Sequence, residues 1–207
     1  MGKLLSTRPD KSAIEEGARI LRSGGVIAYP TETYYGLGAD PFNAAAVQRV
    51  FQIKRRSAAE PILLLIPTLE SLACVVQRIT PLSKRLMDRF WPGPLTIVLE
   101  ASQRLPGLLT GETGTVGVRL CCAPAALSLL QAWGSALTAT SANRSGEGPL
   151  ASAEEVARRL GDDLDMVVDG GATPGGLPST VVDARGEKLI ILREGRIASS
   201  DLESALD

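Results

Sequence analysis

Residues 26–38, VIAYPTETYYGLG, join a short apolar run to a loop rich in hydroxyl groups and glycine. The apolar run, residues 26–29, has the length and composition of a buried strand, and the loop spans Pro30 to Gly38. Residues 136–146 share this design, because the apolar run at 136–139 leads into TSANRSG. Loops at strand ends are where α/β proteins place ligand-binding groups, so both loops are predicted to face a ligand.

Capped helices and short strands alternate loosely along the rest of the chain. Helices are predicted at residues 12–22, 80–90, 124–133 and 152–160 and after Asn43, from capping residues that precede apolar positions. Strands are predicted at residues 61–66, 95–99, 116–120, 166–168, 180–183 and 189–192. Because some strands follow one another without a helix between them, the pattern predicts an α/β fold with a mixed sheet and flanking helices.

Composition excludes several classes of function. The chain of 207 residues suits one domain, and its net charge of −1 argues against a dedicated nucleic-acid binder. It contains no histidine, which rules out Ser-His-Asp and Cys-His catalysis and histidine-containing zinc sites. No signal peptide is indicated, and no apolar run approaches the roughly 20 residues that span a membrane. The three cysteines are expected to be small buried residues in a reducing, cytoplasmic compartment.

Four cationic side chains are candidates for binding an anion. Lys54, Arg55 and Arg56 follow a predicted helix, and the spacing favours Lys54 and Arg56 on the same side; the alternative is a solvated helix end. Arg119 ends an apolar strand, where either a carboxylate ligand or a structural acidic partner fits. The hydroxyl and amide groups of the two loops have a similar alternative, since such side chains often satisfy turn backbone.

Taken together, these pieces resemble the YrdC/Sua5 family of L-threonylcarbamoyladenylate synthases. The resemblance covers residues 12–197 and rests on the following pieces in order: Pro30–Gly38, Lys54-x-Arg56, WPGPLT at 91–96, Val118-Arg119, TSANRSG at 140–146, STVVD at 179–183 and LREG at 192–195. It implies a single YrdC-like domain over residues 1–207, built as a twisted mixed sheet with a concave ligand cavity. It also implies that the additional C-terminal domain of longer family members is missing.

The resemblance further implies an enzyme that condenses L-threonine, bicarbonate or CO2 and ATP into threonylcarbamoyl-AMP, releasing pyrophosphate. Mg²⁺ would be carried with ATP, and no protein side chain is expected to bind a metal. Other proteins would transfer the group to tRNA, as N6-threonylcarbamoyladenosine, with weak contact to tRNA or double-stranded RNA.

The implied catalytic residues are Lys54 and Arg56. The implied threonine-binding residues are Thr31, Tyr35, Arg119 and Ser179, and the implied nucleotide-binding residues are Lys54, Arg56, Thr140, Ser141, Asn143 and Arg193. On this basis Lys54→Ala would abolish pyrophosphate release and leave the fold intact.

Two other functions remain open from the sequence. One is a YrdC-like protein that binds double-stranded RNA or tRNA, which a concentrated basic face would support. The other is a divergent paralogue that acts on another carbamoylated substrate. Ser57 and Cys121 stand at positions where family members commonly have other residues, and this keeps the second alternative open.

Overall fold

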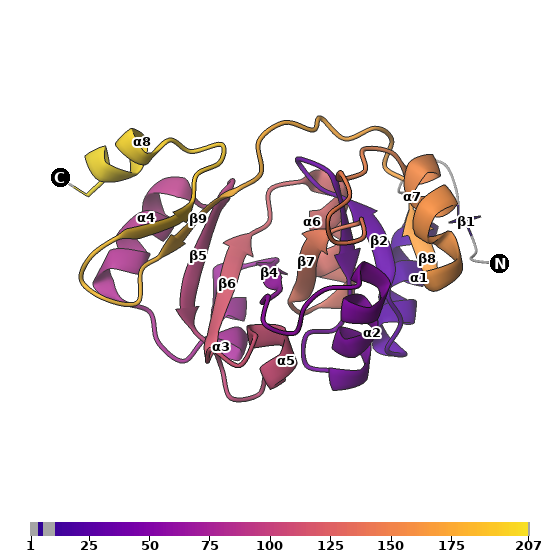
Figure 1. Ribbon diagram of the computed structural model, residues 1–207, viewed down its shortest axis with the longest axis horizontal. Coiled ribbons are helices and arrows are strands. Elements are labelled where there is room, and N and C mark those ends of the chain that lie inside the picture. The colour runs from indigo at the N-terminus through magenta and orange to yellow at the C-terminus, as the bar shows by residue number, and fades with distance from the viewer. Residues whose placement is uncertain (1–3, 6–10, 207) are drawn as a thin grey trace.

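The computed structural model describes residues 4–5 and 11–206, and in this part of the chain ten strands form one mixed sheet. The strand order is β1-β8-β2-β3-β7-β4-β6-β5-β9-β10. Pairs β1–β8, β2–β8, β4–β6 and β5–β9 are parallel, and the other neighbours are antiparallel. The predicted α/β class with a mixed sheet is therefore confirmed, and Figure 1 shows the sheet running between helices along the long axis of the molecule.

The strands and helices lie mostly where the sequence places them. The strands are β1 (Leu4–Leu5), β2 (Ile27–Pro30), β3 (Tyr35–Gly38), β4 (Leu63–Ile66), β5 (Leu95–Glu100), β6 (Thr115–Leu120), β7 (Leu137–Ser141), β8 (Met166–Val168), β9 (Thr180–Asp183) and β10 (Ile190–Arg193). The helices are α1 (Lys11–Arg22), α2 (Ala44–Lys54), α3 (Leu72–Val75), α4 (Pro81–Phe90), α5 (Gly107–Thr110), α6 (Pro124–Trp133), α7 (Ala153–Leu160) and α8 (Ser199–Ser204), with 3-10 turns at Leu69–Ser71 and Gly161–Asp163.

Helices cover both faces of the sheet and bury a separate apolar cluster on each. The larger cluster joins the sheet to α2, α4 and α7, and the smaller one joins it to α1 and α6. The strands divide their side chains between the two clusters, as a period of two requires. Ala28 and Leu64 belong to the larger cluster, whereas Ile27, Tyr29 and Leu65 belong to the smaller one. This packing fixes the strand ends, where the predicted ligand-binding loops begin.

Three of the four capping predictions hold. The Asn43 side chain accepts hydrogen bonds from the first turn of α2, and Thr80 forms a capping box with Ser83. The capping box predicted at Ser152 is half formed: the Ser152 side chain accepts from the Glu155 amide, but the Glu155 carboxylate accepts from the Ala151 amide. The predicted cap at Ser12 is wrong, because α1 already includes Lys11 and Ser12 therefore lies inside the helix.

The predicted loop from Pro30 to Gly38 is corrected by the structure, because its second half is strand β3. Residues 35–38 pair antiparallel with β2, from Pro30 opposite Tyr35 to Ile27 opposite Gly38. Two glycines in four residues hide the strand from a propensity argument. Here glycine is needed for space, since a Cβ at Gly38 would lie 2.8 Å from the Leu137 side chain and 2.9 Å from the Tyr29 ring. The true turn is therefore only residues 31–34.

Helix α2 ends in a strained residue that offers a test of stability. Arg55 is exposed and has φ 51° and ψ 41°, a left-handed conformation that costs a residue with a Cβ about 1–2 kcal/mol. We expect Arg55→Gly to raise the free energy of unfolding by about 0.5–1 kcal/mol, because the strain that glycine removes exceeds the loss from the extra backbone entropy of the unfolded chain. Urea unfolding measures the change. Lys84→Gly, in the exposed face of α4, is the control and should destabilise; a loss of stability in Arg55→Gly would contradict the prediction.

Candidate active site

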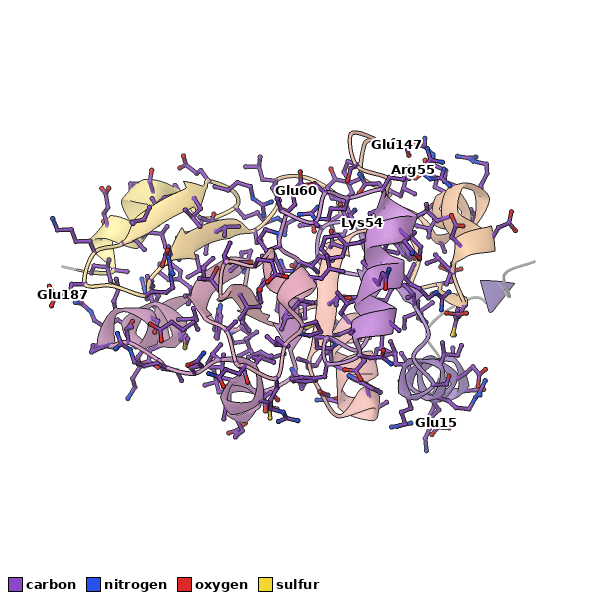
Figure 2. All side chains as sticks on the ribbon, turned by 60° about the horizontal axis from the view of Figure 1, so that its bottom comes forward. Glu15, Lys54, Arg55, Glu60, Glu147 and Glu187 are labelled. Atoms are coloured by element: carbon purple, nitrogen blue, oxygen red, sulfur yellow. The ribbon has the colours of Figure 1, made fainter. Side chains whose placement is uncertain are left out.

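A cavity of about 400 Å³ opens where the β2–β3 turn, β7 and the end of α2 meet, a size that suits a small ligand. It collects nearly all the residues that the sequence singled out. Those that line it are Thr31, Tyr35, Arg56, Arg119, Thr140, Ser141, Asn143, Ser179 and Arg193. Lys54 is the predicted site residue that does not line it. Figure 2 shows Arg55, Glu60 and Glu147 near the upper edge of the molecule, Lys54 deeper below them, and Glu187 at the far left end.

The β2–β3 turn forms one wall through its hydroxyl groups. The Thr31 hydroxyl donates to the Tyr34 carbonyl at 2.6 Å and accepts from the Thr33 amide at 3.2 Å. Part of its role is thus to satisfy the turn, as the structural alternative expected. The Thr31 and Thr33 side chains nevertheless line the cavity, so the same turn that closes the hairpin presents two hydroxyl-bearing residues to a ligand.

Residues 169–179 form a segment without helix or strand, which Figure 1 shows crossing between β8 and β9, and which we call the roof because its Pro178 and Ser179 line the cavity. Tyr35 holds it, since the phenol donates to the Gly171 carbonyl at 2.8 Å and accepts from the Gly170 amide at 3.2 Å. The Gly175 amide donates to the Thr33 carbonyl at 2.7 Å. Burial raises the pKa of Tyr35 to about 12, so the phenol keeps its proton and its donor role. Tyr35 therefore anchors the roof as well as lining the cavity.

Arg119 has both a place in the cavity, where it could bind a carboxylate ligand, and an acidic protein partner, the two alternatives that the sequence left open. It lines the cavity from β6, and its guanidinium forms an ion pair with the Glu32 carboxylate from the β2–β3 turn. The two side chains are 11% and 13% exposed, so the pair is nearly buried. Sequence reasoning did not assign Glu32 a role. Its place between two cavity-lining threonines is the signal that points to it.

Two further guanidinium groups complete the cationic lining. Arg56 donates from Nε to the Glu60 carbonyl at 3.0 Å and from Nη2 to the Pro61 carbonyl at 3.1 Å. Arg193 donates to the Ser179 carbonyl at 2.9 Å. Burial lowers the pKa of both arginines, and the nearby Arg119 charge lowers that of Arg193 further. An anionic ligand would relieve this crowding of positive charge.

Lys54 supports the second loop from behind. Its side chain is 2% exposed, and its ammonium donates to the Ser141 and Asn143 carbonyls at 2.5 and 2.8 Å. The Asn143 amide in turn donates to the Arg144 carbonyl at 3.0 Å and the Glu147 carbonyl at 2.7 Å. Lys54 therefore fixes the loop whose side chains line the cavity. Arg55 points elsewhere, as the spacing predicted, and lines a different depression with Arg49 and Arg144.

The buried ammonium gives a pH test. Burial, with repulsion from Arg56, lowers the pKa of Lys54 from 10.5 to about 8. Between those values the unfolded chain holds more protons at this position than the folded chain, so this group makes the free energy of unfolding rise with pH. We expect the wild type to gain stability relative to Lys54→Met from pH 8 to 10.5, by about 3 kcal/mol at most. Urea unfolding of both proteins across that range measures the difference, and a constant difference would contradict the prediction.

Cysteines and acidic groups add no further centre within residues 4–5 and 11–206. The expectation of buried cysteines holds for Cys121 but is wrong for Cys74 and Cys122, which are exposed; all three are free thiols. In the same residues, no cluster of three or more cysteine or acidic side chains is arranged to hold a metal ion. None of the helices described there is both long and apolar enough to cross a bilayer.

Three guanidinium groups and two hydroxyl-bearing loops line one cavity of this α/β protein, an arrangement that suits a small anionic ligand. The family model Sua5/YciO/YrdC, described as telomere recombination, matches residues 19–195, and the chain belongs to that family.

Curated relatives and solved structures agree with this assignment. A threonylcarbamoyl-AMP synthase of Thiobacillus denitrificans is 41% identical over 90% of this chain and 99% of that protein. One of Pyrococcus abyssi is 36% identical over 96% of this chain, which spans only 58% of that longer protein. The crystal structure of P. abyssi Sua5 complexed with L-threonine matches with a TM-score of 0.91 at 36% identity, over 95% of this chain and 58% of that one. Escherichia coli YciO matches with a TM-score of 0.87 at 28% identity, over 98% and 100%. The predicted twisted mixed sheet with flanking helices is confirmed.

Proposed function

We propose that this protein is a threonylcarbamoyl-AMP synthase, which condenses L-threonine, bicarbonate or CO2 and ATP into L-threonylcarbamoyl-AMP and pyrophosphate. The observation that carries the proposal is the convergence of Arg56, Arg119 and Arg193 on one cavity. Curated relatives that match most of this chain bear the name of this enzyme, and one related structure holds L-threonine.

The chemistry joins two anions, so charge compensation is the main task of the site. A carbamate oxygen of N-carboxylated threonine attacks the α-phosphorus of ATP, and the bond to the pyrophosphate leaving group breaks. In our proposal Arg119 binds the threonine carboxylate, beside Thr31, Tyr35 and Ser179. Fixed guanidinium groups stabilise developing charge without reorganisation during the reaction, and they hold both reactants in line.

The nucleotide is proposed to lie against the second loop. Thr140, Ser141, Asn143 and Arg193 line that part of the cavity with Arg56. Lys54 would act there indirectly, through the carbonyl groups that it holds. Mg²⁺ would be carried with the phosphates of ATP. In the wider proposal the enzyme acts in the cytoplasm, where separate transfer proteins move the threonylcarbamoyl group to tRNA.

The structure does not favour the RNA-binding alternative. A depression lined by Arg49, Arg55 and Arg144 carries positive charge, but two of these arginines are paired with acids. Arg49 contacts Asp165 at 2.8 Å, and Arg144 contacts Asp163 at 3.3 Å. Paired guanidinium groups offer less charge to a phosphate backbone, whose binding depends on counterion release by unpaired cations.

Pyrophosphate release from ATP tests the proposed function. The 207-residue chain is assayed with Mg²⁺, with and without L-threonine and with and without bicarbonate, and the other amino acids are scanned. Release that needs both threonine and bicarbonate supports the synthase and the sufficiency of one domain. Release with a different amine would favour the divergent paralogue, and intact ATP binding without release would contradict the proposal.

A further inference from the structure

Glu32 is a nearly buried carboxylate whose hydrogen-bonding capacity is only partly used. Its Oε1 contacts the Arg119 guanidinium, whereas Oε2 is, among the described residues, a buried carboxylate oxygen without a hydrogen-bond donor. The Arg119 guanidinium compensates its charge as an ion pair. The nearby groups that carry protons are engaged elsewhere, because Tyr29 donates to the Thr138 carbonyl at 3.0 Å and the Cys121 thiol faces the Ala123 carbonyl at 3.7 Å. A buried acceptor without a donor is costly, so its retention calls for an explanation.

The position of Glu32 connects it with the cavity. Thr31 and Thr33 on either side of it line the cavity, and so does its partner Arg119. The carboxylate thus stands in the wall directly behind the group proposed to bind the substrate carboxylate. Glu32 does not itself line the cavity, so a ligand donor reaches its oxygens only if Arg119 turns from Glu32 toward an anion to which that donor is attached.

We infer that Glu32 and Arg119 together recognise the substrate as a zwitterion, an inference that rests on the proposed function. A free amino acid carries a carboxylate and an ammonium on the same carbon. On binding, its carboxylate pairs with Arg119 and its ammonium donates to Glu32. One internal ion pair is exchanged for two pairs with the ligand, and the net charge of the protein groups does not change. An arginine alone would leave the ammonium desolvated without an acceptor, which is unfavourable.

Calorimetry with two ligands tests the inference apart from turnover. L-Threonine is compared with 2,3-dihydroxybutyrate, in which a hydroxyl replaces the ammonium, on the wild type, Glu32→Gln and Glu16→Gln. Glu16 pairs with Arg19 at 2.6 Å on α1, outside the cavity lining, and provides a matched control. We expect Glu32→Gln to weaken threonine binding about 10- to 100-fold, the usual effect of losing a charge-assisted hydrogen bond, and to leave the analogue nearly unchanged. Glu16→Gln should bind both ligands like the wild type.

Each outcome decides between specific explanations. If Glu32→Gln weakens the binding of both ligands equally, Glu32 only positions Arg119, and the inference is overturned. Unchanged threonine binding in Glu32→Gln would overturn it as well. If Glu32→Gln does not fold, as judged by ATP binding and melting, the wild type still decides: binding the analogue as tightly as threonine overturns the inference. A wild type that binds threonine and releases pyrophosphate keeps the proposed function in either case. If the wild type neither binds threonine nor releases pyrophosphate, both the inference and the proposed function are overturned.

Discussion

Arg119→Met should lower the free energy of unfolding by about 3 kcal/mol, because it leaves the buried Glu32 carboxylate without a counter-charge. Glu32→Gln in the same chain should restore part of this loss, since the uncompensated charge is then removed. Arg119→Met and the double variant should both lose threonine-dependent pyrophosphate release, because neither retains the Arg119 guanidinium. Urea unfolding of the two single variants and the double variant measures the coupling between the side chains.

Arg185→Met is the matched control for this cycle. Arg185 pairs with Asp183 at 2.7 Å, but its side chain is 42% exposed. Exposed ion pairs contribute about 0–1 kcal/mol, so this variant should remain close to the wild type in stability and activity. If Arg119→Met were as stable as Arg185→Met, the pair with Glu32 would be no more than a surface contact.

Lys54→Met should reduce pyrophosphate release by about 100-fold or more, because a displacement of about 1 Å in a positioning element can cost that much. The variant loses the donor that holds the Ser141 and Asn143 carbonyls. Its stability at pH 7 should change little, since removing the burial cost of the ammonium offsets the lost hydrogen bonds. The activity assay and a melting curve measure these two effects.

Hydrogen exchange distinguishes an indirect role of Lys54 from direct contact with phosphate. If Lys54 acts through the loop, residues 141–147 should exchange faster in Lys54→Met, while β4 and β6 keep their protection. Lys84→Met, on the exposed face of α4, should match the wild type in every measurement. Unchanged exchange in the loop together with lost activity would favour direct contact with the nucleotide.

The sequence predicted which residues line the cavity better than it predicted how those residues are held in place. Residue type and position at the ends of helices and strands predicted Arg56, Arg119 and the two loops as candidates, and the structure places all of them on one cavity. Lys54 is different: its burial depends on the carbonyl groups of a loop far along the chain. Glu32, in the β2–β3 turn, likewise gains its significance from Arg119 on β6. Tertiary partners of this kind leave no periodicity in the sequence.

The same limit applies to the fold. Strands with alternating or continuous apolar residues, such as β5 and β6, were predicted to within a residue or so. Strand β3 was missed because it contains two glycines, whose value lies in the close packing of Tyr29 and Leu137 against them. Cys74 and Cys122 show that a preference of residue type for burial is overridden where the chain reaches the surface.

The strand order also has a consequence for the protein while it is being synthesised. Strand β2 pairs on one side with β8, and β5 pairs on one side with β9, and both partners come from the last quarter of the chain. On the ribosome, the first 165 residues therefore offer two open sheet edges, each able to pair with another nascent chain. Chaperone demand and aggregation during expression should fall once residues 166–183 leave the exit tunnel and cover both edges.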